Sequence, residues 1–180
     1  MCQGAEGSSP GVQSSLGAGG APYSGFRLRP MEVRDIPTVM AIEVRSFSLP
    51  WTEDSFLREI EKIPFSRPVV AEDPDGGENG QGSAIVGYAC WWEVKDECHI
   101  TNVTVSPETR RRGVGKFLLT EIIEDARRRG AIRATLEARM SNEAAISLYE
   151  KFGFIAVAMR PKYYPDNGED AMVMLKDMSE

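Results

Sequence analysis

Apolar and polar residues alternate along the chain with two distinct periods, and each period predicts one kind of secondary structure. Apolar positions spaced three or four residues apart predict helices at 35–47, 114–129 and 142–152. A further short helix is predicted after Thr52, which is a suitable N-cap residue. These helices are separated by short apolar segments typical of strands.

Strands are predicted in short segments rich in apolar residues, of which 98–105 alternates with β-branched residues. These segments are a short one that starts at Phe26, then 68–72, 84–94, 98–105, 132–138, 154–159 and 171–175. With the helices they give the order β-α-α-β-β-β-α-β-α-β-β, which is typical of an α/β or α+β domain with a mixed sheet and helices on its faces. The order of the strands within that sheet does not follow from the pattern.

Two glycine-rich segments interrupt this alternation. Residues 1–25 are rich in Gly, Ser, Ala and Pro and carry almost no charge, so they cannot bury enough surface to offset the entropy lost on ordering. We therefore expect a disordered tail at 1–25 and a single domain at 26–180. The segment 73–83 lies between two predicted strands, and we expect it to form a long hairpin loop.

Composition narrows the class of protein. The 180 residues include 21 Lys and Arg against 27 Asp and Glu, which gives a formal net charge of −6. A surplus of acid argues against general nucleic-acid binding, where a basic patch normally dominates. No apolar run approaches the length of about eighteen residues that a membrane span needs, and residues 1–25 lack the basic and apolar regions of a secretory signal. We expect a cytoplasmic protein.

Few residues are available for metal or nucleophilic chemistry. The cysteines, Cys2, Cys90 and Cys98, have no C-x-x-C spacing and fit neither a disulfide framework nor a zinc site. The single histidine, His99, cannot alone support a metal site or a Ser-His-Asp triad, and we expect a strand residue with a satisfied ring. Any catalysis must therefore use a cofactor, carboxylates, tyrosines or backbone groups, without a bound metal.

The sharpest local feature lies between the strand that ends at Val105 and the helix that begins at Val114. Gly113 and Gly115 allow successive backbone N–H groups to point at one spot beside a helix N-terminus, which makes an anion site suited to a pyrophosphate. The segment matches neither a Walker A loop nor a dinucleotide-binding fingerprint, because residues that those motifs require are missing. A plain tight turn beside a solvated arginine run at 110–112 is the alternative.

The pattern Arg110-x-x-Gly113-x-Gly115, placed after a strand and opening a helix, resembles the acetyl-CoA signature of the GCN5-related N-acetyltransferases. The second half strengthens this resemblance through L-E-x-R-x-S-N at 136–142, L-Y-x-x-x-G-F at 148–154, and the Y-Y-P and E-D-A pieces that follow. The similarity covers nearly all of the predicted domain. It implies a mixed, mostly antiparallel central sheet flanked by about four helices.

The resemblance also implies acetyl-CoA as the co-substrate, with its pyrophosphate held by the glycine turn. The strand before that turn would splay from its neighbour and bind the pantetheine arm through backbone groups. The family pattern assigns the cofactor to Val103, Thr104, Val105, Arg111, Arg112, Gly113, Val114, Gly115, Lys116 and Asn142.

For acetyl transfer, the resemblance assigns Glu137 as the base, acting through ordered water, and Tyr149 as the acid that protonates the departing thiolate. A modest base suffices for an α-amine, whose pKa of about 7.7–8.0 leaves roughly one molecule in ten neutral at pH 7. The acceptor would contact Trp51, together with Tyr163 and Tyr164 in the expected loop between the last two strands. By spacing alone, Tyr149 fits a core position better than an acid, and a lone strand carboxylate such as Glu137 is more often solvated or salt-bridged. Trp51 fits a helix anchor as well as an acceptor contact.

In detail the resemblance is to family members that acetylate the N-terminal alanine of a basic ribosomal protein, small-subunit protein eighteen, by direct transfer. The surplus of acid outside the glycine turn would suit a cationic acceptor. Other protein N-termini or a small amine are alternative acceptors, and a non-catalytic acyl-CoA-binding module is the alternative of another class. We expect no contact with nucleic acid or membrane, and a monomer is favoured over an oligomer.

Overall fold

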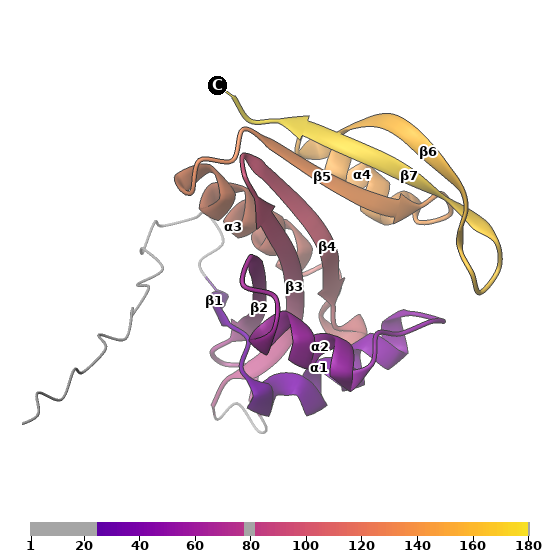
Figure 1. Ribbon diagram of the computed structural model, residues 1–180. Helices are drawn as coiled ribbons and strands as arrows, with labels where there is room; N and C mark the ends of the chain where they lie inside the picture. Colours follow the sequence, from indigo (N-terminus) through magenta and orange to yellow (C-terminus); the bar gives the residue numbers. More distant parts are fainter. Residues whose placement is uncertain (1–24, 78–81, 180) are drawn as a thin grey trace, which may run out of the picture.

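The computed structural model describes residues 25–77 and 82–179. The expected tail at 1–25 therefore lies outside the described residues except for Gly25, and so does the middle of the expected hairpin loop at 73–83. The helices are α1 (Ile36–Ser46), α2 (Glu53–Glu61), α3 (Val114–Arg128) and α4 (Glu143–Lys151). The strands are β1 (Arg27–Pro30), β2 (Ser66–Asp73), β3 (Ala84–Val94), β4 (Glu97–Val105), β5 (Arg133–Arg139), β6 (Ile155–Tyr164) and β7 (Glu169–Asp177). Their order along the chain is the predicted one (Figure 1).

Within the described residues, seven strands form one sheet in the order β1-β2-β3-β4-β5-β7-β6. Each neighbouring pair is antiparallel except β4 and β5, which are parallel and are connected through α3. This mixed, mostly antiparallel sheet with helices on its faces confirms the expected fold class (Figure 1). No helix in the described part of the chain is long and apolar enough to cross a membrane.

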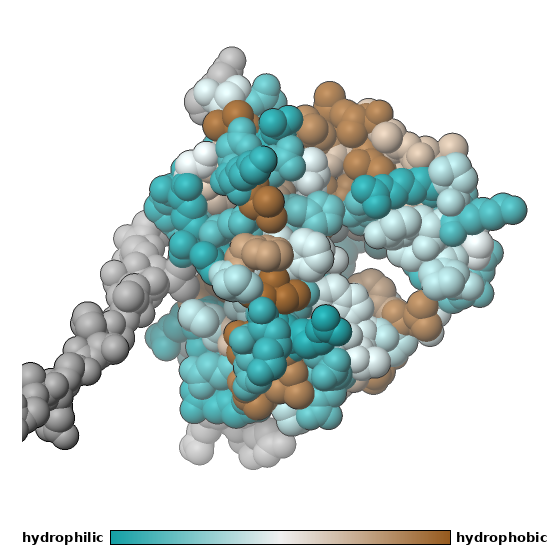
Figure 2. All heavy atoms as spheres, in the orientation of Figure 1, coloured by the Kyte–Doolittle hydropathy of each residue, from teal (hydrophilic) through white to brown (hydrophobic). Residues whose placement is uncertain are grey.

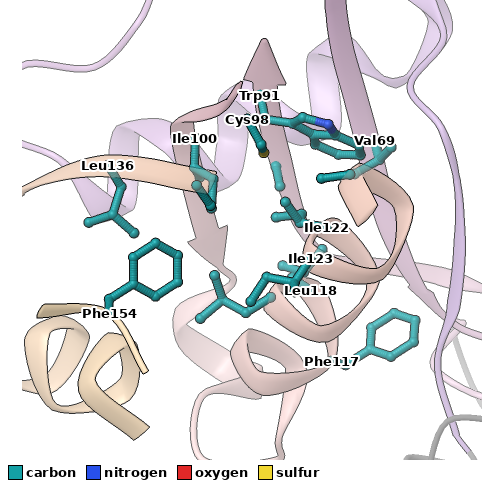
Figure 3. Packing of buried hydrophobic residues seen from close by; sticks show 14 of the residues in the cluster. Val69, Trp91, Cys98, Ile100, Phe117, Leu118, Ile122, Ile123, Leu136 and Phe154 are labelled. Atoms are coloured by element: carbon teal, nitrogen blue, oxygen red, sulfur yellow. The ribbon is translucent and has the colours of Figure 1, made fainter. Parts of the chain in front are cut away.

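Two apolar clusters hold the helices to the sheet. The larger cluster packs α3 against β3, β4 and β5, and it includes Leu118, Leu136 and Phe154 (Figure 3). The smaller cluster packs α1 and α2 against the sheet. Val69 and Val70 are consecutive on β2 but belong to different clusters, because successive side chains of a strand point to opposite faces. The two pairs of helices therefore cover opposite faces of the sheet.

The parallel contact between β4 and β5 is short, and this shapes the site. Pairing runs only from Glu97 opposite Arg133 to Ile100 opposite Leu136. Directly after Ile100 the register with β3 shifts, leaving Thr101 without an opposite residue, which is the signature of a β-bulge. Beyond this point β4 stays paired with β3, while β5 continues along β7 and the two parallel strands separate.

Helix starts follow local sequence signals. Oγ1 of Thr52 accepts a hydrogen bond from the Ser55 N–H at 3.2 Å, which confirms Thr52 as the N-cap of α2. Oδ1 of Asn142 accepts one from the Ala145 N–H at 3.2 Å and caps α4 in the same way. Gly113, which precedes α3, has a φ of 90°, a left-handed conformation that favours glycine.

Strand β6 is longer than the predicted segment 154–159. It includes Tyr163 and Tyr164, so their expected placement in the following loop is wrong. The strand continues because Tyr164 still pairs with Glu169 of β7. The register is irregular just before this pair, where Lys162 has a φ of 52°. The sequence pattern ends early because the apolar run stops at Met159 and is followed by Arg160, Pro161 and Lys162.

Candidate active site

A cleft of about 1170 Å³ opens where β4 and β5 separate. Its walls are the end of β4, the N-terminal ends of α3 and α4, the end of α1 and the turn between β6 and β7. Figure 2 shows the molecule hollowed on this face, between the α1–α2 side and the β6–β7 hairpin. The cleft therefore brings together four stretches of the chain that are far apart in the sequence, 46–48, 103–116, 139–151 and 167–169.

The glycine turn lies at one end of the cleft. Gly113 and Gly115 line it, and a Cβ atom at Gly115 would lie 3.3 Å from Cδ2 of Leu148 and 3.5 Å from Cγ2 of Val105. A larger residue would therefore crowd the wall beside the N-terminus of α3. The first N–H groups of a helix have no partner within the helix, so this end of α3 is suited to phosphate oxygens.

The arginines of the turn have different surroundings. Arg110 and Arg111 line the cleft together with Lys116. Arg112 does not, because its Nη2 pairs with Oδ2 of Asp73 at 2.7 Å. Arg110 is the first residue of the motif, but the resemblance does not assign it to the cofactor, and its place in the cleft is found only in the structure.

The end of β4 presents an open edge to the cleft. Val103, Thr104 and Val105 line it, as expected. The Thr104 side chain is buried on the other face, where Oγ1 donates to Oδ1 of Asn102 at 2.8 Å. Beyond Ile100 no described strand pairs with the edge of β4 that faces β5. Main-chain groups on this edge are thus placed to bind an extended ligand.

Glu137 lies on β5 beside the split, but its side chain does not line the cleft. The side chain is 10% exposed and its two oxygens have separate partners. Nη2 of Arg160 is 3.1 Å from Oε1, and Nε2 of His99 is 3.4 Å from Oε2. His99 is a strand residue whose Nδ1 also lies 3.0 Å from Oγ1 of Thr135, which confirms the expected satisfied ring.

Tyr149 and Asn142 both belong to the α4 wall and line the cleft. Burial, and then the nearby Tyr164, raise the pKa of Tyr149 to about 12. The phenol is therefore protonated at physiological pH and able to donate a proton. Its ring also packs edge to face on Phe154, with centroids 6.0 Å apart. Tyr149 thus combines the core position that its spacing allows with access to the cleft.

The expected acceptor residues lie around the cleft and not in its lining. Trp51 packs on Phe56 with ring centroids 5.3 Å apart. The main-chain N–H of Trp51 donates to Oε1 of the buried Glu43 at 2.8 Å. Tyr163 is 44% exposed, and Tyr164 lies under the guanidinium of Arg139. On this side the cleft is lined instead by residues that the sequence did not indicate, which are Ser46, Phe47, Ser48, Arg139, Asn167 and Glu169.

The charges around the cleft differ from one end to the other. Cationic side chains gather at the glycine turn, whereas the β6–β7 turn carries carboxylates. No group of three or more His, Cys, Asp or Glu suited to a metal ion occurs among residues 25–77 and 82–179. The arrangement fits a ligand with phosphates at one end and a reacting group near the split between β4 and β5.

Comparison with known proteins identifies the family. The family model described as the Acetyltransferase (GNAT) family matches residues 36–154, which include the whole of the glycine turn and the α4 wall. The chain belongs to the GNAT acetyltransferase family. The expected family is thereby confirmed, and this GNAT protein is an enzyme of the N-acetyltransferase class.

Relatives of this GNAT protein match almost the entire domain. A Bacillus subtilis (strain 168) protein is 39% identical over 153 residues, which are 85% of this chain and 96% of that protein. The ribosomal protein bS18-alanine N-acetyltransferase of Escherichia coli (strain K12) is 34% identical over 151 residues, 83% of this chain and 95% of that enzyme. The crystal structure of the ribosomal-protein-S18-alanine N-acetyltransferase from Escherichia coli has a TM-score of 0.73 at 31% identity, covering 86% of this chain and 95% of that one. The expected similarity to ribosomal-protein alanine N-acetyltransferases is confirmed.

Proposed function

We propose that this protein transfers the acetyl group of acetyl-CoA to the N-terminal alanine of ribosomal protein bS18. The observation that carries the proposal is the extent of the similarity to the Escherichia coli enzyme of that name, which spans 95% of that enzyme. The similarity therefore extends well beyond the cofactor turn.

Acetyl-CoA is the donor, and its pyrophosphate binds at the glycine turn. The N–H groups at the start of α3 donate hydrogen bonds to the phosphate oxygens. Arg110, Arg111 and Lys116 add positive charge. The pantetheine arm lies along the open edge of β4, where Val103 and Val105 supply main-chain groups. In this binding mode the thioester lies beside the split between β4 and β5, near Glu137 of β5 and Tyr149 of α4.

The acceptor nitrogen attacks the thioester carbonyl directly. A C–N bond forms, the C–S bond breaks, the amine proton passes through water to Glu137, and the thiolate takes a proton from Tyr149. Glu137 is held by its contacts with Arg160 and His99, so its carboxylate has a fixed direction. The pKa of about 12 keeps Tyr149 protonated until the thiolate leaves. A neutral α-amine is common enough at pH 7 for a carboxylate base to suffice.

The acceptor is a cationic peptide. The net charge of −6 favours the approach of a basic ribosomal protein. Tyr163, which is 44% exposed at the end of β6, offers an aromatic surface to the first residues of the peptide.

The test is incubation of the full chain with acetyl-CoA and a bS18 peptide that begins with alanine, followed by mass spectrometry. We expect a mass gain of one acetyl group on the α-amine and none on the same peptide with a blocked N-terminus. Turnover only on lysine side chains or polyamines, or no turnover on any amine, would contradict the proposal.

Two substitutions test the proposed chemistry. Glu137→Gln and Tyr149→Phe should each lower kcat at least about a hundredfold, because general acid–base groups contribute rate factors of this size. The affinity for acetyl-CoA should stay close to that of the wild type. Glu97→Gln is a matched control, since Glu97 is an exposed carboxylate on β4 that pairs with Arg133 at the surface. Unchanged kcat in both variants would remove the two residues from the mechanism.

A further inference from the structure

We propose that Arg139 is a positioning residue for acceptor recognition, which fixes the turn between β6 and β7 and the ring of Tyr164 beside the cleft. This role rests on the proposed function, which makes the acceptor a peptide N-terminus. Arg139 is the last residue of β5 and follows Glu137 by two positions, so both side chains leave the same face of the strand.

The guanidinium of Arg139 bonds to two residues of the turn and to the first residue of β7. Nη2 donates to the two carboxylate oxygens of Asp166, at 2.9 and 2.8 Å. Nη1 donates to Oδ1 of Asn167 at 3.2 Å and to Oε2 of Glu169 at 3.1 Å. The side chains of Arg139, Asp166 and Glu169 are 21%, 17% and 14% exposed. Solvent therefore screens these ion pairs less than it screens ordinary surface pairs.

The flat face of the same guanidinium covers an aromatic ring. Cζ of Arg139 lies 3.9 Å from the ring centroid of Tyr164, which is a close cation–π contact. The ring of Tyr163 in turn meets Tyr164 edge to face, with centroids 5.2 Å apart. Arg139 thus orients the ring of Tyr164. The ring of Tyr164 in turn supports the exposed Tyr163, which faces the acceptor.

The turn is also linked to two other walls of the cleft. The Ser48 hydroxyl, in the loop between α1 and α2, donates to Oδ2 of Asp166. The Ser141 N–H, just before α4, donates to Oε1 of Glu169 at 2.7 Å. Hydrogen bonds from Ser141, and next in order the bond from Arg139, lower the pKa of Glu169 to about 2. This carboxylate is therefore ionised at any pH used to assay an amine acceptor.

Arg139 acts through these neighbours, because both of its terminal nitrogens are bonded within the protein even though its side chain lines the cleft. A lysine at this position would keep the positive charge. Its single nitrogen cannot, however, replace both Nη2, which bonds to Asp166, and Nη1, which bonds to Asn167 and Glu169. It also lacks the planar group that stacks on Tyr164. Arg139→Lys should therefore loosen the acceptor side of the cleft and leave the glycine turn, which Arg139 does not contact, as it is.

The test compares Arg139→Lys with Arg133→Lys in steady-state kinetics. Arg133 is a matched control, since it lies on the same strand and pairs at the surface with Glu97 at 2.9 Å. For Arg139→Lys we expect KM for the bS18 peptide to rise about ten- to a hundredfold, as expected for lost hydrogen bonds between charged groups. We expect kcat and KM for acetyl-CoA to change less than about twofold. An unchanged peptide KM, or a loss confined to kcat, would overturn the proposal.

A second readout does not depend on turnover. In the unliganded protein, amide hydrogen exchange at 163–169 should be faster in Arg139→Lys than in the wild type and unchanged in Arg133→Lys. If the wild type acetylates no protein N-terminus, the proposed function fails, and the exchange rates still decide whether Arg139 orders the turn. Identical exchange in the two variants would overturn its positioning role.

Asp166→Asn provides a variant for the case in which Arg139→Lys does not fold. It alters the turn side of the same contact and leaves the whole of β5 intact. We expect the same rise in peptide KM with kcat maintained, and an unchanged KM would overturn the proposal.

Discussion

The guanidinium of Arg160 reaches across β7 to the carboxylate of Glu137, with Nη2 3.1 Å from Oε1. The other carboxylate oxygen lies 3.4 Å from Nε2 of His99. The proposed base is therefore oriented by side chains from two other strands, β4 and β6, and its position relative to the cleft depends on how the two halves of the sheet meet.

Replacing Arg160 with glutamine removes one of the two groups that orient Glu137. Because the Arg160 side chain is 55% exposed, the pair contributes as a partly screened contact. We expect kcat to fall about two- to fivefold while KM for acetyl-CoA is unchanged. Steady-state kinetics at saturating peptide measure this, with Arg133→Gln as the control. A kcat equal to that of the wild type would mean that the base needs no orientation from β6.

The arginines of the glycine turn should differ in their effect on the donor. Arg110→Gln removes a cation that lines the cleft, so we expect KM for acetyl-CoA to rise about tenfold and to depend less on salt. Arg112→Gln should change it less than about twofold, because the Arg112 guanidinium faces Asp73 at 2.7 Å. Kinetics at low and high ionic strength distinguish the two. Equal effects would contradict the assignment of Arg110 to the phosphates.

Gly87 on β3 should tolerate no side chain. A Cβ atom there would lie 2.8 Å from the main-chain oxygen of Thr104 and 3.1 Å from Cγ1 of Val114. Since a strand backbone cannot easily move aside, Gly87→Ala should lower the free energy of unfolding by about 1–3 kcal/mol. Urea denaturation measures the change. Gly25→Ala is the control, because a Cβ at Gly25 would meet no atom within 4 Å.

The phenols of Tyr149 and Tyr164 should ionise only at a higher pH than exposed tyrosines do. Burial is the largest cause that raises the pKa of Tyr149 and of Tyr164 to about 12. The folded protein thus holds these protons more tightly than the unfolded chain. Their contribution to stability is fully present below pH about 10 and is lost as the pH rises to about 12.

Ultraviolet titration of tyrosinate checks this directly. We expect an early phase from exposed phenols and a late phase above pH about 11, whose amplitude falls in Tyr149→Phe and in Tyr164→Phe. Native protein that titrates completely in one phase near pH 10 would show that neither phenol is buried.

The features predicted correctly from the sequence are those that depend on neighbouring residues. The order of helices and strands, the Thr52 cap and the Gly113 turn all depend on residues within a few positions of one another, so a periodic pattern or a short motif reveals them. The family motif also drew attention to residues that the fold does bring to the cleft, such as Tyr149.

Contacts between distant segments could not be predicted in this way. Arg112 turns away from the cleft because Asp73 comes close to it from the end of β2. The extension of β6 depends on pairing with β7, and the contacts of Arg139 depend on where the following hairpin turn lies. In each case the deciding partner is set by the sheet, and no local pattern indicates it.

The short pairing of β4 with β5 has a consequence for how the donor site persists through evolution. A groove built from main-chain groups at 101–105 is inherited with the fold and not with particular side chains. Substitutions that preserve the strand leave the groove unchanged, whereas a one-residue insertion that shifted the register would destroy it. Substitutions in the side chains that face the acceptor would therefore leave the proposed donor groove unchanged.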